Sequence, residues 1–205
     1  CGYHGWHDWY LSINLKNKNN LNEHLINGIG AEGVLKDLKN SILSFSYNDF
    51  NTLKSLVLSN KDISAIVMEV ERNVKPKNNF LKKVRNLATK NNITLIFDEC
   101  TSGFRTTLGG LHMKYKVYPD ICLFGKALGN GYPINAVIGK DDIMKKADKA
   151  FISSTFWSER LGTSAALKTI EIMERDKTYL KIIDLSNKVK NIWRQIANIH
   201  KLAIQ

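Results

Sequence analysis

Residues 94–105 read Thr-Leu-Ile-Phe-Asp-Glu-Cys-Thr-Ser-Gly-Phe-Arg. The largely apolar run over 93–97 is typical of a strand that is buried on both faces. It ends on two carboxylates, Asp98 and Glu99, and a carboxylate in that position is costly unless a cationic partner compensates it. Functional groups of parallel sheets gather at the carboxyl ends of the strands, so this stretch predicts where a site lies.

The segments around this stretch alternate between strand-like and helix-like patterns. Strands are expected over residues 41–46, 63–69, 93–97, 121–124 and 134–139. Helices are expected over residues 48–58, 80–90, 141–149, 161–174 and 179–200, the first capped by Asn48 or Asp49. Residues 14–40 are polar and predict a surface excursion. The alternation predicts an α/β domain with a largely parallel sheet flanked by helices.

Composition limits the class of protein. The chain has 205 residues, of which 43% are hydrophobic and 9% aromatic, so it is a folded domain and not a disordered tail. No apolar run approaches the ~18 residues of a membrane helix, and no signal-peptide pattern opens the sequence. We therefore expect no membrane partner. The cysteines, Cys1, Cys100 and Cys122, have no framework spacing, which favours reduced thiols and a cytoplasmic protein.

The charge is strongly basic, with 30 Lys and Arg against 19 Asp and Glu and a net charge of +11. The lysines are scattered and often stand beside asparagine. Arginine, the usual reader of phosphates and guanine, is scarce. The pattern favours a solvated surface, and we expect no nucleic-acid partner.

Two interpretations compete for the strand-end carboxylates. In the first, Asp98 or Glu99 holds magnesium beside a nucleotide, as in an ATPase. That site needs a phosphate loop upstream, whereas the Gly125-Lys126 pair lies downstream and is followed by Ala127. In the second, Asp98 meets a protonated ring nitrogen. Lys126 follows a predicted strand among small residues, and such a lysine with a strand-end aspartate matches a pyridoxal phosphate site.

Four blocks in order carry a family resemblance. They are residues 2–8 (Gly-Tyr-His-Gly-Trp-His-Asp), residues 95–105, residues 119–133 around Gly125-Lys126, and residues 153–157 (Ser-Ser-Thr-Phe-Trp). Together they resemble the class III aminotransferases of fold type I, most closely the glutamate-1-semialdehyde aminotransferase-like branch.

The resemblance implies a fold type I large domain, incomplete, with pyridoxal 5′-phosphate as cofactor. Lys126 would form the Schiff base and Asp98 would pair with the pyridine nitrogen. Tyr3 would lie against the ring face with His4 as its neighbour, and Thr155 would bind the cofactor phosphate of the partner subunit in a homodimer. Residues 1–176 would be the central part of the large domain, and residues 177–205 a helix leading toward a small domain.

The implied reaction is a transamination between an amine donor and a keto-acid or aldehyde acceptor. A glutamate-1-semialdehyde 2,1-aminomutase is the first alternative. An inactive remnant and a nucleotide-dependent ATPase are the others. The chain is expected to be the middle of a longer enzyme, which alone binds cofactor weakly and does not turn over.

Two departures from the family pattern bear on the substrate. Glu69 is followed by Val70 where the family usually has proline, so Glu69 is only a candidate substrate-side residue. Thr155 is followed by a bulky run, residues 156–160, unlike the small run of the aminomutases. No metal site is expected, because His4 and His7 stand without further clustered ligands.

Overall fold

The computed structural model describes residues 3–5, 7–15, 30–156 and 158–204. Cys1, Gly2, Trp6 and Trp157, which entered the sequence interpretation, lie outside the described residues, as do residues 16–29 of the expected surface excursion.

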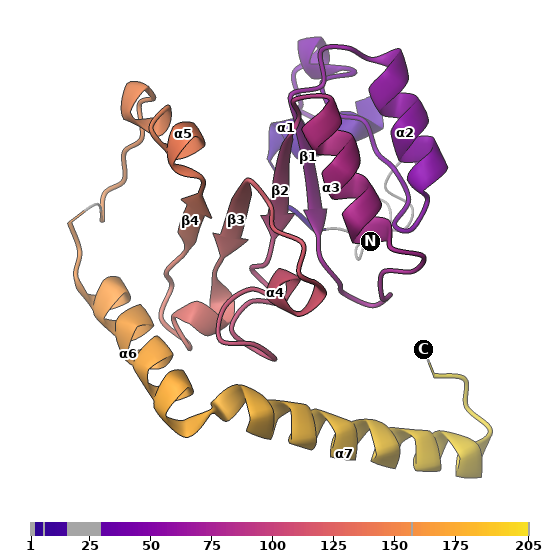
Figure 1. Ribbon diagram of the computed structural model, residues 1–205, viewed down its shortest axis with the longest axis vertical. Helices are drawn as coiled ribbons and strands as arrows, with labels where there is room; N and C mark the ends of the chain where they lie inside the picture. The colour runs from indigo at the N-terminus through magenta and orange to yellow at the C-terminus, as the bar shows by residue number, and fades with distance from the viewer. Residues whose placement is uncertain (1–2, 6, 16–29, 157, 205) are drawn as a thin grey trace.

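The described residues form a four-stranded sheet in the order β1-β2-β3-β4 (Figure 1). Its strands are β1 (Ala65–Glu69), β2 (Thr94–Asp98), β3 (Ile121–Phe124) and β4 (Ala136–Gly139). The pairs β1–β2 and β2–β3 are parallel, whereas β4 runs antiparallel to β3. The prediction of a largely parallel sheet is confirmed.

Helices α2 (Phe50–Ser59) and α3 (Phe80–Lys90) lie side by side near β1 and β2 (Figure 1). The Asp49 carboxylate caps α2 by accepting the Thr52 backbone N–H at 3.0 Å, as the sequence predicted. The predicted inward face of α3 is buried at Leu81, Val84, Leu87 and Ala88.

The other described helical segments have three or four residues as far as Lys149, and the two after it are longer. They are α1 (Asp8–Leu11), α4 (His112–Tyr115), α5 (Asp141–Met144), α6 (Leu161–Asp176) and α7 (Thr178–His200), with 3-10 turns η1 (Ser12–Leu15), η2 (Lys36–Leu38), η3 (Lys126–Leu128) and η4 (Ala147–Lys149). The helix expected over 141–149 is therefore divided between α5 and η4. Within the described ranges, no helix is long and apolar enough to span a membrane.

The core lies between the sheet and α2–α3. Val84, Ala88, Leu95 and Phe97 have no solvent exposure, and they belong to one continuous hydrophobic cluster. This packing fixes β2 in the centre of the sheet, and with it the strand end that carries Asp98.

The prediction of a strand over residues 41–46 is wrong. The backbone N–H and the hydroxyl of Ser41 both bond the Leu38 carbonyl, at 3.0 and 2.6 Å, so the preceding turn satisfies them. Leu43 is 37% exposed. Ile42 and Phe45 are only half-buried, and Ser41 satisfies its hydrogen bonds locally, so little favours the addition of this segment to the sheet.

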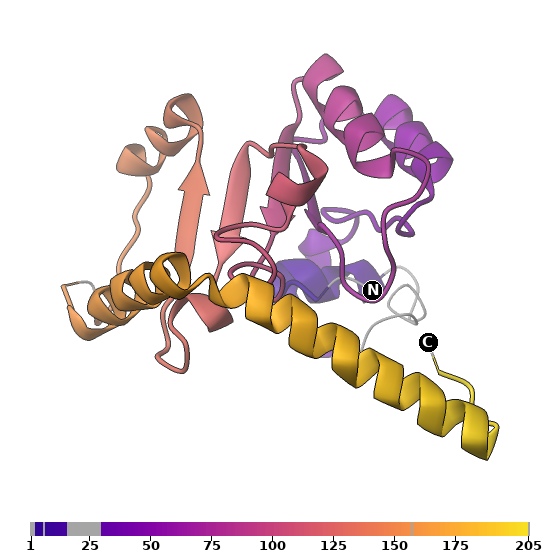
Figure 2. The same ribbon diagram turned by 60° about the horizontal axis from the view of Figure 1, so that its bottom comes forward.

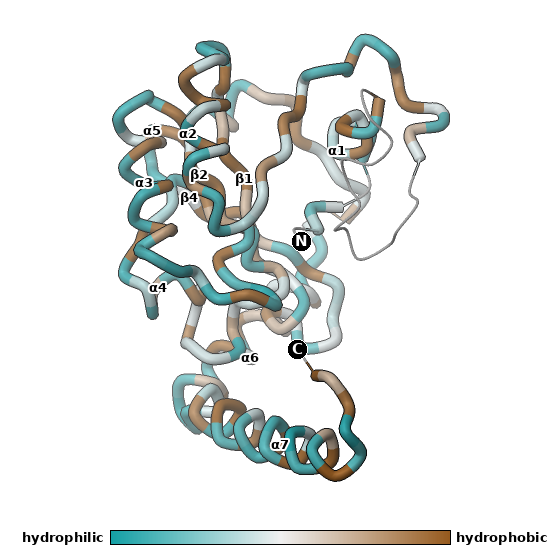
Figure 3. Tube along the Cα trace, turned by 90° about the vertical axis from the view of Figure 1, so that its right-hand side faces the viewer, coloured by the Kyte–Doolittle hydropathy of each residue, from teal (hydrophilic) through white to brown (hydrophobic). Residues whose placement is uncertain are grey.

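Helix α7 forms as predicted, but its apolar residues are not core residues in the described structure. Figures 1 and 2 show α7 running past the sheet, and Figure 3 shows apolar and polar residues interleaved along it. Ala197 is its one buried residue among those described, whereas Leu185 and Trp193 are each 63% exposed.

Candidate functional site

Parallel pairing brings the predicted residues to one edge of the sheet. Glu69 and Asp98 end β1 and β2 and are paired in register. Lys126 stands two residues after β3, whose end points to the same side (Figure 1). The carboxyl ends of three adjacent strands therefore carry two carboxylates and an amine.

The partner of Asp98 is His4. His4 Nδ1 lies 2.8 Å from Asp98 Oδ2, and the Cys100 backbone N–H donates to Oδ1 at 3.0 Å. Asp98 is only 7% exposed. Burial by itself raises the pKa of this carboxyl, but the His4 and Cys100 hydrogen bonds outweigh it and hold the pKa below its ordinary value. Asp98 is thus ionised at neutral pH and requires a donor on each oxygen.

Lys126 is held differently. Its Nζ donates to Thr101 Oγ1 at 2.8 Å, and the side chain is exposed. The ion pairs of the described residues do not include Lys126. Its backbone is left-handed, with φ 45°, an unfavourable state for a residue with a Cβ. Leu128, 5% exposed, anchors the η3 turn that begins at this lysine.

Small residues keep the approach to Lys126 open. A Cβ added to Gly125 would lie 2.3 Å from Asn135 Oδ1 and 3.5 Å from Cys100 Sγ. A larger residue at this position would therefore displace the Asn135 side chain. The pKa of the nearby Cys100 thiol is raised to about 11, mainly by burial and to a smaller extent by the negative charge of Asp98. This thiol is therefore protonated at neutral pH.

Glu99 has a separate role from Asp98. It is fully buried, and its two oxygens accept the Leu111 N–H at 2.6 Å, the His112 N–H at 2.9 Å, the Ser102 hydroxyl at 2.7 Å and His112 Nδ1 at 2.7 Å. Burial raises its pKa, but these donors outweigh burial and lower it overall. The carboxylate ties together the two ends of the loop after β2, which leaves it no free lone pair for a magnesium ion.

Cys122 joins Glu99 and His112 in a compact group, with Sγ 3.8 Å from His112 Nδ1. Burial raises the pKa of the Cys122 thiol well above its usual range. The group combines residue types that bind metals, but its carboxylate is already satisfied by protein donors. The hydrogen bonds of Glu99 and His112 explain why these residues lie together.

Glu69 pairs with Arg72 at 3.1 Å, and burial raises the pKa of this carboxyl despite that partner. The neighbouring Tyr10 is buried as well. Its pKa is raised to about 12, mainly by burial and to a smaller extent by the negative charge of Glu69. Arg72, a residue that the sequence interpretation left without a role, thus lies on the β1 side of the candidate site.

Tyr3 and Thr155 are placed less closely. Tyr3 is half-buried and precedes His4, so it lies at the same sheet edge. Thr155 is exposed in a turn flanked by Phe151 and Phe156, which are 98% and 75% exposed. Among the contacts of the described residues, none joins Thr155 to Lys126. Its role across a subunit interface stays a prediction.

Sequence reasoning missed two contacts. It assigned no role to Thr101, and it described His4 as a neighbour of Tyr3 without pairing it to Asp98. Thr101 follows Asp98 by three residues on the loop that leaves the sheet edge, and that position was the available signal. The His4 contact spans 94 residues of sequence, and no local pattern encodes it.

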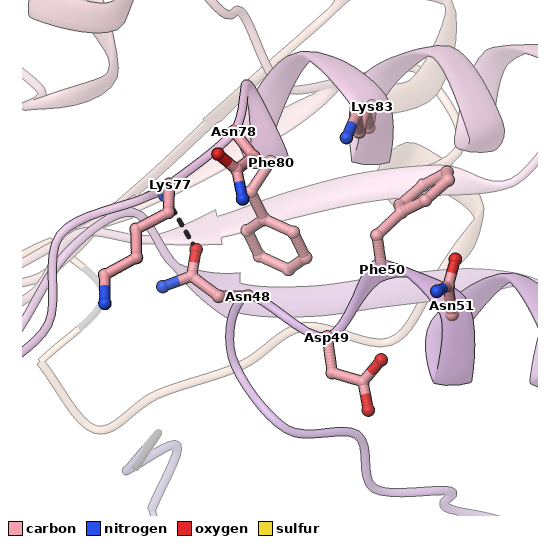
Figure 4. Close-up of a pocket in the computed structure, with 8 residues that line it drawn as sticks. All are labelled: Asn48, Asp49, Phe50, Asn51, Lys77, Asn78, Phe80 and Lys83. Carbon is pink, nitrogen blue, oxygen red and sulfur yellow. Dashed lines mark hydrogen bonds between the residues drawn. The ribbon is translucent and has the colours of Figure 1, made fainter.

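A surface hollow lies away from these residues, at the amino-terminal ends of α2 and α3 (Figure 4). Asn48 crosses it by accepting the Lys77 N–H at 2.8 Å and donating to the Lys75 carbonyl at 3.0 Å. These bonds join the loops before the two helices. The hollow contains none of the strand-end residues.

Comparisons with known proteins identify the family. Residues 2–202 match the family model described as aminotransferase class-III, and the chain belongs to that family. It is 41% identical over 187 residues to a 3-aminobutyryl-CoA aminotransferase of Cloacimonas acidaminovorans (strain Evry), covering 86% of the chain and 40% of that protein. It is 34% identical over 197 residues to a glutamate-1-semialdehyde 2,1-aminomutase of Sulfolobus acidocaldarius, covering 93% and 44%.

Solved structures share the fold. An omega-transaminase from Sphaerobacter thermophilus superposes with a TM-score of 0.72 at 23% identity, over 84% of this chain and 42% of that one. An ornithine aminotransferase from Toxoplasma gondii, which holds PLP at partial occupancy, gives 0.65 at 26% identity, over 78% and 41%. The predicted family and fold class are confirmed. The chain spans less than half the length of these relatives.

Proposed function

We propose that this chain is the lysine-bearing part of a pyridoxal-phosphate-dependent transaminase, which moves an amino group between an amine or amino acid and a keto acid or aldehyde. The observation that carries the proposal is that Asp98 and Lys126 lie at the ends of adjacent parallel strands. Asp98 is ionised and hydrogen-bonded, and the Lys126 amine takes part in no ion pair of the described residues.

The residues present fit the cofactor. When bound, pyridoxal 5′-phosphate supplies a protonated ring that accepts electrons from the substrate carbon. Asp98 would pair with the ring nitrogen and keep it protonated, because a carboxylate with a lowered pKa stays anionic beside it. Since the ionised carboxylate only accepts, His4 Nδ1 donates to it and fixes its orientation. Tyr3, which precedes His4, would cover one face of the ring.

Lys126 has two tasks in this proposal. Its Nζ would hold the cofactor, and its amine would take up and return a substrate proton as general acid and base. Exposure of the side chain and the small Gly125 beside it leave the amine accessible. Thr155 would contact the cofactor phosphate of a partner subunit, which makes the functional form a homodimer.

The test is a titration with pyridoxal 5′-phosphate followed by visible absorbance, on the chain and its Lys126→Ala variant. The intact chain is expected to develop the absorbance of lysine-bound cofactor, weakly because the chain spans part of its relatives. The variant is expected to show only free cofactor. Equal spectra for both proteins would refute the assignment of Lys126.

The second candidate is a glutamate-1-semialdehyde 2,1-aminomutase, favoured by the 34% identity to such an enzyme. The reactions differ in stoichiometry. A transaminase needs a separate acceptor, whereas the aminomutase isomerises a single substrate. Product analysis with and without an added keto acid separates them.

The described thiols, Cys100 and Cys122, are both free, which supports a cytoplasmic location.

A further inference from the structure

In the part of the chain that the structure describes, the hydroxyl of Thr101 accepts a hydrogen bond from the Lys126 amine. The distance from Lys126 Nζ to Thr101 Oγ1 is 2.8 Å, within the range of a good hydrogen bond. Thr101 is half-buried and lies three residues after Asp98. One short segment therefore presents both the carboxylate and a hydroxyl to the site.

The Thr101 segment is held in place by its surroundings. Arg105 Nε donates to the Thr101 carbonyl at 2.5 Å. On the next residues, the Ser102 hydroxyl and the Gly103 N–H donate to the Glu99 carboxylate and carbonyl at 2.7 and 2.8 Å. Glu99 itself is fully buried. The hydroxyl is therefore carried by a loop whose conformation is fixed independently of the lysine.

The Lys126 side chain, by contrast, has no other described anchor. Its backbone is fixed by η3, where the Asn130 N–H donates to the Lys126 carbonyl at 3.2 Å. The side chain beyond it is exposed and has many rotamers to lose. The nearby Cys100 thiol is protonated at neutral pH and offers no negative charge. Thr101 thus limits where the amine can lie.

We propose that Thr101 is a positioning residue for Lys126, whose hydroxyl holds the amine toward the sheet edge before the cofactor is attached and receives it again when it is released. A hydroxyl both accepts and donates, so it holds the protonated and the neutral amine alike. The inference rests on the proposed function of Lys126.

The test compares Thr101→Val, which removes the hydroxyl at nearly constant shape, with Thr101→Ser, which keeps it. Thr94→Val is the matched control, because Thr94 begins β2 at the end opposite Asp98. Each chain is titrated with pyridoxal 5′-phosphate, whose aldehyde condenses with an amine and releases water, and with pyridoxine 5′-phosphate, which binds without condensing.

After mixing, Thr101→Val is expected to develop the absorbance of lysine-bound pyridoxal 5′-phosphate several-fold more slowly, because its amine is no longer held toward the sheet edge where the cofactor would lie. The affinity for pyridoxine 5′-phosphate is expected to stay unchanged. Thr101→Ser and Thr94→Val should match the original chain with both ligands. A Thr101→Val variant that attaches pyridoxal 5′-phosphate at the original rate would overturn the inference. So would a variant that also loses affinity for pyridoxine 5′-phosphate, since a structural role affects the two ligands alike.

A second measurement needs no cofactor. Trinitrobenzenesulfonate modifies lysine amines, and peptide mass spectrometry follows its rate at Lys126. We expect Lys126 of Thr101→Val to be modified several-fold faster, because this reagent arrives from solvent and meets an amine that is no longer held toward the sheet edge. Thr101→Ser should be unchanged. An unchanged rate in Thr101→Val refutes the inference. A faster rate in a chain that binds no pyridoxal 5′-phosphate supports Thr101 and contradicts the proposed function.

Discussion

At the scale of single residues, the site depends on which partner each charged group receives. Asp98 has His4, Lys126 has Thr101, and Glu99 has the loop that follows it. The neighbouring carboxylates of the Asp98-Glu99 pair thus have different surroundings. One faces the candidate cofactor site, and the other holds the backbone that shapes it.

The His4 contact predicts a pH effect. His4→Ala removes a hydrogen bond that lowers the pKa of Asp98, while burial, which raises the pKa, remains. The acid limit of pyridoxal 5′-phosphate binding, measured by absorbance across pH, should move to higher pH. His7→Ala is the control, because His7 is exposed and stacks on Trp9. Identical pH limits in the two variants would contradict the assigned role of His4.

Glu99 predicts a second pH effect, on stability. Its pKa is lowered in the folded chain, so its contribution is complete above the ordinary value of 4.5 and is lost as pH falls through the folded pKa. Glu99→Gln should therefore be less stable at neutral pH and lose less further stability below pH 4.5. Urea unfolding at pH 7 and in the acid range checks this, and parallel pH curves would refute it.

The left-handed backbone of Lys126 predicts a difference between two variants that both lack the amine. Lys126→Gly should be more stable than Lys126→Ala by about 1 kcal/mol, because only glycine adopts φ 45° without steric cost. Chemical unfolding of the two proteins measures it. Equal stabilities would show that the backbone at this position relaxes when the side chain is shortened.

At the scale of elements, the sequence pattern predicted helices and strands correctly where the spacing of the apolar residues matches the side chains that are buried in the structure. The bounds of α3 and β3 were predicted as observed, since the apolar positions of α3 repeat at helical spacing and β3 is a short apolar run. The strand expected over residues 41–46 was wrong, because a pattern does not reveal whether a pairing partner exists. Asp98 and Lys126 could be predicted as site residues because both follow predicted strands. The His4–Asp98 contact could not, because it joins segments that meet only in the folded chain.

Helix α7 gives a prediction at this scale. Leu185→Glu should change the free energy of unfolding by no more than about 0.5 kcal/mol, because Leu185 is 63% exposed. Leu95→Ala in β2 should cost about 2–5 kcal/mol, since Leu95 is fully buried. Urea unfolding of both variants makes the comparison. A large loss in Leu185→Glu would mean that the apolar face of α7 is covered in solution.

At the scale of the whole molecule, the sheet brings distant segments to one edge. His4, Asp98 and Lys126 come from three separate parts of the sequence, and the parallel pairs β1–β2 and β2–β3 set their order. The net charge of +11 describes the surface of this chain and does not determine the chemistry at that edge. In the proposed homodimer, the exposed Thr155 turn would contact the partner subunit.

The most direct measurement of the central claim is the position of covalently bound cofactor. The chain is incubated with pyridoxal 5′-phosphate, reduced with borohydride, digested and analysed by mass spectrometry. We predict that the cofactor mass is found on the peptide containing Lys126 and is absent from that peptide in Lys126→Ala. Labelling spread over surface lysines, with Lys126 no more labelled than the others, would contradict the account.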